Sequence, residues 1–438
     1  MKPLLILLAC LLPLAARQRP NILFLLSDDQ AWGDYGFMGH LHIETPHLDA
    51  LAARSLTFTR GYSPVPLCRP SLASILTGRH PHEHRITGND LLPPRPDLKA
   101  LAGRRDPDFG QRYRELIAHY RQQPNWIQSL RESGYRTLQT GKWWEGDPVA
   151  DGGFTAGMTH GDPARGGRHG DAGLAIGRQG LQPIKDFTTS SPDTPWFVWY
   201  GVFLPHTPHN PPADLLAKYL QKTDNENIAA YWACCEWLDQ TIGELLAHLE
   251  ESGQLDNTLI LYTCDNGWIQ DPADRNLYAP RSKQTIYEGG IRTPILLSWP
   301  GHLQPLRDDE HLASNLDLWP TAAALCDLPL PAGLPGINLT DRAAVTSRQS
   351  LFGADYSHDI RDFAHPARNL EARYHLRGPW KLLLPHPPAD PAGEPQLYHL
   401  LNDPHERHNL ASEHPDLVES LRQGLNDWWT PAPAQASE

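Results

Sequence analysis

Five segments of the chain are short and almost continuously apolar, which is the pattern of strands buried on both faces of a sheet. They are NILFLLS from residue 21, YRTLQT from 135, WFVWYGVFL from 196, TLILYT from 258 and TPILLSW from 293. Between the third and the fourth of them, the segment NIAAYWACCEWLDQTIGELLAHLEESG from residue 227 predicts one long helix that ends at Gly253. The alternation of strands and helices predicts an α/β fold with a large, mostly parallel sheet between helices.

The pattern changes towards the carboxyl end of the chain. The proline-rich segment CDLPLPAGLPGINL from residue 326 marks the end of the main sheet. From about residue 365, two strands around Trp380 and Tyr398 and a closing helix, PDLVESLRQGLNDWW, predict a small α+β subdomain. We therefore expect a signal segment at 1–16, a catalytic domain at 17–340 with an insertion at 90–121, and a connecting segment with the subdomain at 341–438.

The insertion contains one amphipathic helical pattern, DFGQRYRELIAHYRQ. Its place in the chain favours two interpretations, a cover over the mouth of the site or a surface appendage.

The net charge and the N-terminal segment limit which partners and which cellular compartment we expect for the protein. The formal net charge is -13, without a block of Lys or Arg, which argues against binding to nucleic acid. The segment MKPLLILLACLLPLAA predicts a secretory signal cleaved near Ala16, and its apolar run is too short to span a membrane. We expect an exported protein, periplasmic or extracellular, without a transmembrane segment in the mature chain. The stretch LLAC, ending at Cys10, leaves a lipoprotein as the alternative.

Polar residues follow four of the predicted strands at the point where each strand ends. The list is Asp28 and Asp29 after the first, Lys142 after the second, His206 after the third, and Asp265 with Asn266 after the fourth. In an open parallel sheet, ligands bind beyond the carboxyl ends of the strands. Each residue alone is typical of a turn or a helix cap, but together they predict one site at one edge of the sheet.

The residue types at this edge indicate a metal-assisted reaction on an anion. Carboxylate and amide oxygens suit a hard divalent cation, and we favour Ca²⁺ over Mg²⁺. Lys142 and Lys283 suit an anionic substrate group, and His206 is placed to donate a proton to a leaving oxygen.

Cys68 lies in the segment PLCRPSLASILTGRHP, where the prolines and serine predict a short helix stopped by Gly78. A thiol at a helix N-terminus is expected to have a lowered pKa. Five cysteines remain after Ala16, and their odd number and spacing indicate no disulfide framework. Beyond the helix, His80, His82 and His84 alternate, and we expect an extended loop there rather than a metal site.

Taken in order, these motifs resemble the type I sulfatases of the alkaline phosphatase superfamily. NILFLLSDDQAWGDYG is similar to the opening strand and metal-binding pair of that family, and CRPSLASILTGR to its signature C-x-P-S-R-x-x-x-L-T-G-R. ESGYRTLQTGKWW, PHTPH, CDNG, KQTIYEGGIRTP and LDLWPT follow, and LRGPWKLLL and QLYHLLNDPHERHNLA are similar to its C-terminal subdomain. The resemblance covers nearly the whole mature chain and implies an alkaline-phosphatase-like sandwich.

The resemblance also implies a mechanism. In sulfatases the signature cysteine is oxidised by a maturation enzyme to formylglycine (3-oxoalanine), whose hydrate is the nucleophile. When these roles are carried over to the matching positions of this chain, Cys68 becomes the formylglycine and contacts the calcium. Lys142 and Lys283 then hold the sulfate, and His206 protonates the departing alcohol. Asp28, Asp29, Asp265 and Asn266 bind the cation, and Arg79 matches the second arginine of the signature. The implied substrate is a sulfate monoester of a carbohydrate or an aryl alcohol.

Two positions depart from the pattern of the family. Leu72 stands where the signature has Arg, and Trp144 stands where the family has His; in the family both groups bond to the formylglycine. Three interpretations remain. Other residues replace the missing groups, such as Arg69, or His169 with Asp171. Alternatively, the chain is an altered member that acts on phosphate or phosphonate esters, or it has no catalytic activity and only binds a sulfated ligand. The first interpretation leads, because every other part of the site is present.

Overall fold

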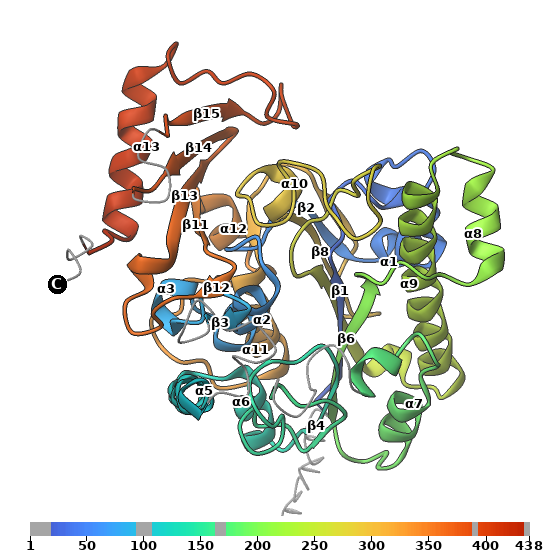
Figure 1. The fold of residues 1–438 in the computed structure, drawn as a ribbon. Helices are drawn as coiled ribbons and strands as arrows, with labels where there is room; N and C mark the ends of the chain where they lie inside the picture. Colours follow the sequence, from blue (N-terminus) through green and yellow to red (C-terminus); the bar gives the residue numbers. More distant parts are fainter. Residues whose placement is uncertain (1–18, 93–106, 163–171, 388–392, 433–438) are drawn as a thin grey trace, which may run out of the picture.

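The computed structural model describes residues 19–92, 107–162, 172–387 and 393–432 of the chain. It comprises a large α/β body and a smaller lobe formed by the carboxyl-terminal part of the chain (Figure 1). The expected signal segment at 1–16, His169 and Asp171 lie outside the described residues.

The body is built on a nine-stranded sheet with the order β10-β2-β8-β7-β1-β6-β4-β5, in which β9 also pairs with β2. Its strands are β1 (Asn21–Asp28), β2 (Leu56–Tyr62), β4 (Arg136–Gly141), β5 (Ala156–Gly157), β6 (Trp196–Pro205), β7 (Thr258–Cys264), β8 (Arg292–Ser298), β9 (Leu306–Asp308) and β10 (Ala313–Ser314). Among these, only β8 runs antiparallel to its neighbours. The five predicted strands and the mostly parallel sheet are confirmed. We did not predict β2, because LTFTRGY mixes apolar and polar residues although all seven are buried.

The described α-helices are α1 (Pro46–Ala53), α2 (Cys68–Thr77), α3 (Pro81–His84), α5 (Pro107–Tyr120), α6 (Trp126–Glu132), α7 (Gln182–Thr189), α8 (Ala213–Leu220), α9 (Glu226–Glu251), α10 (Glu288–Ile291), α11 (Leu318–Cys326), α12 (Arg342–Ser347) and α13 (Pro415–Trp428). Helices of the body cover both faces of the large sheet, whereas α13 packs on the smaller lobe. The predicted long helix is α9; the Asn225 side chain caps its start, and Gly253 follows it with a φ of 68°. None of the described helices is both long and apolar enough to cross a bilayer.

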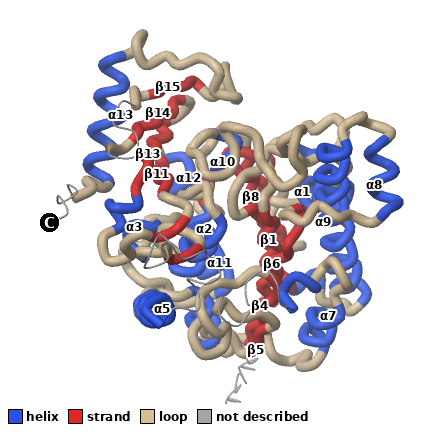
Figure 2. The backbone as a smooth tube through the Cα atoms, viewed as in Figure 1, coloured by secondary structure: helices blue, strands red, loops and turns tan. Residues whose placement is uncertain are grey.

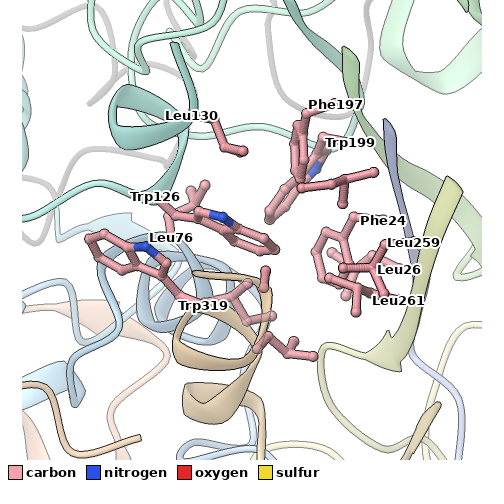
Figure 3. Close-up of a cluster of buried hydrophobic side chains, with 14 of the residues drawn as sticks. Phe24, Leu26, Leu76, Trp126, Leu130, Phe197, Trp199, Leu259, Leu261 and Trp319 are labelled. Atoms are coloured by element: carbon pink, nitrogen blue, oxygen red, sulfur yellow. The ribbon is translucent and has the colours of Figure 1, made fainter. Parts of the chain in front are cut away.

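The central strands are apolar throughout because helices cover both faces of the sheet. In β1, Phe24 and Leu26 pack into one hydrophobic cluster with α2, α6 and α11, whereas Leu23 and Leu25 pack on the opposite face with α1, α7 and α9. Figure 3 shows the first cluster, where Trp126 and Trp319 approach the sheet from the helices. Because successive strand side chains point to opposite faces, a strand covered on both sides has no polar alternation.

The smaller lobe contains a four-stranded antiparallel sheet, red in Figure 2, with α13 packed against it. Its strands are β11 (Ser350–Tyr356), β13 (Leu370–Arg377), β14 (Trp380–Pro385) and β15 (Gln396–His399). The expected strands around Trp380 and Tyr398 and the closing helix are confirmed, but the sheet begins with β11, before residue 365. A short parallel pair, β3 (Asp90–Leu91) with β12 (Asp359–Ile360), also links the two parts of the chain.

The structure tests the predictions for two further segments, the insertion and the histidine-rich segment after α2. The predicted amphipathic helix of the insertion is α5, and its Tyr113 hydroxyl donates to the Trp144 carbonyl. The extended loop expected at His80–His84 is wrong: Pro81–His84 is a short helix, and the ring of His82 stacks on Trp429. Proline at the first helical position favours this turn.

Candidate active site

The carboxyl ends of the central strands bring the predicted residues to one edge of the sheet. Ser27 pairs with Cys264, and Asp28 pairs with Pro205, so β1, β7 and β6 end at the same level. The residues that follow these strands and β4 are Asp28, Asp29, Lys142, His206, Asp265 and Asn266. Lys283 reaches the same cluster from the loop before α10, and Cys68 reaches it as the first residue of α2.

Three carboxylates form the centre of the cluster. One oxygen from each of Asp28, Asp29 and Asp265 lies within 4.8 Å of the others, and all three side chains are buried. The Asn266 amide nitrogen donates to Asp29 Oδ1 at 2.7 Å, and the Asp29 backbone N–H donates to Asp265 Oδ1 at 3.1 Å. In the described part of the chain, Asp28 Oδ2 and Asn266 Oδ1 are buried without a hydrogen-bond partner. Buried oxygens with free lone pairs in an oxygen-only set fit a hard divalent cation.

Two ammonium groups lie among these carboxylates. Lys142 Nζ lies 2.5 Å from Asp28 Oδ1 and 3.2 Å from Asp265 Oδ2. Lys283 Nζ lies 2.6 Å from Asp29 Oδ1 and 2.7 Å from its Oδ2. Burial opposes the charged form of both lysines, but the carboxylates raise their pKa values above the ordinary range. Both lysines therefore carry a positive charge at the site.

The three carboxyl groups differ in acidity. Burial raises the pKa of Asp28 and of Asp265 to about 6, against the opposing effect of Lys142. Burial also opposes ionisation of Asp29, but Lys283 and the other nearby cations hold its pKa well below the ordinary value. Asp29 is therefore ionised at neutral pH, whereas the other two bind protons more readily.

Cys68 lies at the helix N-terminus as predicted, but the pKa of its thiol differs from the prediction. Its Sγ lies within 4.8 Å of an oxygen of Asp28 and a ring nitrogen of His206. Burial raises the pKa of the thiol to about 12, although Lys142 and Lys283 favour the thiolate. The expectation that the helix dipole lowers this pKa is wrong, because removal of the sulfur from water outweighs the favourable charges.

The His206 ring is held in one orientation. Its Nδ1 donates to the Thr207 carbonyl at 2.7 Å, because a carbonyl oxygen can only accept. The other nitrogen, Nε2, lies 3.5 Å from Asp29 Oδ2 and faces the cluster. Burial lowers the pKa of His206 to about 4, although Asp29 opposes this effect. An anionic ligand beside the ring raises this pKa and favours the protonated form.

The two departures from the sulfatase pattern belong to the same apolar cluster as Cys68. Leu72 is 4% exposed and Trp144 is 2% exposed, and both belong to the cluster that fills the space between α2 and the sheet. The Lys142 ammonium nitrogen lies 5.1 Å from the centre of the Trp144 ring. Where the signature has two polar groups, this chain therefore has an apolar wall that also contacts a site lysine.

Neither Arg69, the candidate substitute within the described residues, nor Arg79, the second arginine of the signature, joins the cluster. Arg69 is 1% exposed, and its Nε and Nη2 donate to Glu145 at 2.7 and 2.9 Å, in a buried two-bond ion pair. Glu145 was missed in the sequence, although an acidic residue directly after GKWW was a signal for a buried partner. Arg79 lies beyond the far end of α2, about 15 Å along the ten-residue helix, and its Nη1 is 3.7 Å from Glu83.

Comparison with known proteins agrees with this geometry. The family model described as Sulfatase matches residues 20–328, more than half of the chain, and the model described as N-sulphoglucosamine sulphohydrolase, C-terminal, matches residues 278–429. Arylsulfatase A from Homo sapiens is 29% identical, over 95% of this chain and 89% of its own. N-acetylgalactosamine-6-sulfatase from Homo sapiens is 30% identical, over 74% of this chain and 66% of its own.

Solved structures show the same fold. The crystal structure of Ps i-CgsB has a TM-score of 0.72 at 22% identity and covers 95% of this chain and 94% of its own. A protein solved with its substrate D-glucosamine-2-N,6-O-disulfate has a TM-score of 0.70 at 18% identity, over 95% of this chain and 100% of its own. With the carboxylates, lysines and histidine gathered at Cys68, the chain belongs to the sulfatase family of the alkaline phosphatase superfamily and is a sulfuric ester hydrolase.

Proposed function

We propose that this sulfatase releases sulfate from a sulfated carbohydrate with a formylglycine nucleophile formed from Cys68. The single observation that carries the proposal is the convergence of Cys68, Asp28 and His206, whose ligand atoms lie within 4.8 Å of one another at the start of α2. A formylglycine at this position would supply a hydrated aldehyde as the nucleophile towards sulfur. Every other role falls to side chains already in place around it.

The ligand set of the cation comprises Asp28, Asp29, Asp265 and Asn266, with residue 68 beside them. Ca²⁺ fits these hard oxygen donors, and when bound it supplies positive charge next to the sulfate oxygens. Lys142 and Lys283 orient the sulfate group from two sides. His206 donates a proton from Nε2 to the departing alcohol, because its Nδ1 is committed to the Thr207 carbonyl.

The charge of the site suits an anionic ester. Three carboxylates and two ammonium groups leave one negative charge, which a divalent cation converts to one positive charge. The protonated His206 that the proposed mechanism needs adds a second positive charge. The negative charge of a sulfate monoester is therefore attracted to the site.

The names of similar proteins support a carbohydrate as the alcohol part of the sulfate ester. The N-acetylgalactosamine-6-sulfatase and the protein solved with D-glucosamine-2-N,6-O-disulfate are both named for sulfated sugars. We also propose that the chain is exported, on the basis of the signal-like segment at 1–16.

The first experiment is the mass of the peptide that carries Cys68, from protein exported by a host with a competent maturation enzyme. We expect an aldehyde in place of the thiol, while the peptide with Cys326, a buried cysteine at the end of α11, keeps its thiol as an internal control. Sulfate release from sulfated sugars and from aryl sulfates is measured on the same sample. A Cys68 thiol that persists in the native host, with no sulfate released, contradicts the proposed mechanism.

A further inference from the structure

The segment that carries His206 is rich in proline, which limits the backbone hydrogen bonds it can make. It runs Leu-Pro-His-Thr-Pro-His-Asn from Leu204 at the end of β6, and its prolines have no N–H to donate. Beyond the end of β6, the described backbone bonds of this segment comprise one short turn, in which Asn210 N–H donates to the Pro208 carbonyl at 2.9 Å. The carbonyls of this loop therefore need donors from elsewhere in the chain.

One guanidinium group supplies these donors. The Nε and Nη2 atoms of Arg178 donate to the Phe203 carbonyl at 3.2 and 2.7 Å, and Nη2 also donates to the His206 carbonyl at 2.9 Å. Its Nη1 donates to the Pro208 carbonyl at 3.2 Å and to Asn210 Oδ1 at 2.5 Å. A planar guanidinium has five N–H donors in a fixed arrangement, and here they span the loop on both sides of His206.

Arg178 is itself held in place. It lies in a tight turn in which Gly177 N–H donates to the Gly180 carbonyl at 3.1 Å. Gly177 has a φ of 77°, and a Cβ at this position would lie 2.6 Å from the Tyr200 hydroxyl in β6. On its other side, the guanidinium carbon of Arg178 lies 5.3 Å from the centre of the Trp237 ring in α9. The side chain is therefore fixed between β6 and α9.

We propose that Arg178 is a positioning residue, which holds the backbone of residues 203–210 so that His206 Nε2 faces the departing alcohol. The inference rests on the proposed role of His206 as proton donor. The hydrogen bonds of Arg178 go to carbonyl and amide oxygens of this segment, so Arg178 acts by fixing the position of the backbone. Small displacements of a catalytic group reduce the rate strongly, because proton transfer needs a short donor–acceptor distance.

The test compares Arg178→Ala with a matched arginine outside the site. Arg136 also donates to a backbone carbonyl, that of Phe187 in α7 at 3.3 Å, and its guanidinium lies 4.3 Å from the Phe187 ring. Both variants, with His206→Ala, are assayed on aryl sulfates whose leaving phenols differ in pKa. We expect the loss in kcat for Arg178→Ala to grow from a few-fold for acidic phenols to about 10–100-fold for weakly acidic ones, with KM little changed. Arg136→Ala keeps the wild-type dependence, and Arg178→Lys recovers only part of the loss.

Hydrogen–deuterium exchange of the peptide containing residues 203–210 provides a readout that does not depend on catalysis. We expect faster exchange in Arg178→Ala and wild-type exchange in Arg136→Ala. Unchanged exchange in Arg178→Ala overturns the inference, as does faster exchange with an unchanged dependence on the phenol. If His206→Ala itself lacks a steeper dependence, the proposed role of His206 fails, and the positioning inference fails with it; the exchange data distinguish this from a loop that Arg178 does not hold.

Discussion

The ammonium nitrogen of Lys142 lies 5.1 Å from the centre of the ring of Trp144, the residue that stands where the sequence pattern of the sulfatases has a histidine. The same lysine contacts two of the three carboxylates of the site. The ring therefore borders the group that we propose holds the sulfate. An aromatic face attracts a cation, so Trp144 restricts where this ammonium group can lie.

We expect Trp144→Leu to weaken the inhibition constant of inorganic sulfate by about 3–10-fold, because loss of a partly desolvated cation–π contact costs about 1 kcal/mol. Trp143→Leu is the matched control, because Trp143 is equally buried and its ring donates to the Gly146 carbonyl instead. Both variants lose stability, but only the first changes sulfate binding. Equal inhibition constants for the two variants would show that the ring has no role at Lys142.

Restoring the signature residue at position 72 alone is expected to destabilise the protein. Leu72 is surrounded by apolar side chains, so Leu72→Arg buries a guanidinium there, at a cost of at least about 3 kcal/mol in unfolding free energy. Adding Trp144→His recovers more than about 1 kcal/mol of this loss, because the smaller imidazole leaves space. Leu76→Arg, one turn further along α2, is the control and shows no such recovery. Urea unfolding of the single and double variants measures the coupling, and additive losses would contradict the apolar-wall interpretation.

The buried ion pair between Arg69 and Glu145 is expected to be structural. Arg69→Met or Glu145→Met alone leaves a buried charge without its partner and costs about 3–5 kcal/mol. The double variant recovers most of this loss and keeps kcat/KM within a few-fold of the wild type. If the double variant is stable but inactive, Arg69 has a catalytic role that its contacts do not reveal.

Calcium is expected to bind at the carboxylate cluster and to be required for hydrolysis. Chelation abolishes activity and added Ca²⁺ restores it, while Asp28→Asn lowers the calcium affinity measured by calorimetry at least tenfold. Asp239→Asn is the control with the same chemical change, because this buried carboxyl group accepts from the His47 and Leu48 backbone instead. The affinity falls below about pH 6, where Asp28 and Asp265 bind protons that the cation must displace. Wild-type affinity in Asp28→Asn would place the cation elsewhere.

The histidine helix α3 is expected to destabilise the protein in acid. Burial lowers the pKa of His80 to about 3 and of His82 to about 4, whereas unfolded histidine titrates near 6.5. The unfolded chain therefore binds more protons below pH 6.5, so the stability present above that pH is lost as the pH falls towards 4. Each ring contributes up to about 1.4 kcal/mol per pH unit in this window.

Urea unfolding between pH 8 and pH 5 measures this slope. His82→Phe keeps the stacking on Trp429 and removes one titrating ring, so we expect a shallower slope. His408→Phe, at an exposed position, is the control for the substitution itself. A slope that is identical in His82→Phe and in the wild type would show that this ring binds protons as readily in the folded protein as in the unfolded chain.

The sequence by itself determined the α/β architecture and the members of the central cluster. Strands covered on both faces are apolar throughout, and parallel strands deliver the residues after them to one edge, so Asp28, His206 and Asp265 could be assigned without coordinates. The strand β2 was missed because its buried polar residues are satisfied by distant partners, as in the bond from Arg60 Nη2 to the Gly378 carbonyl.

Only the tertiary structure decided the acidity and the partners of these groups. The helix N-terminus at Cys68 is local and readable, but its thiol pKa depends on how much water the surrounding fold excludes. The pairing of Arg69 with Glu145 and of Arg178 with the His206 loop joins residues that are 76 and 28 positions apart. No local pattern encodes such contacts, because they form only when the loops after different strands pack together.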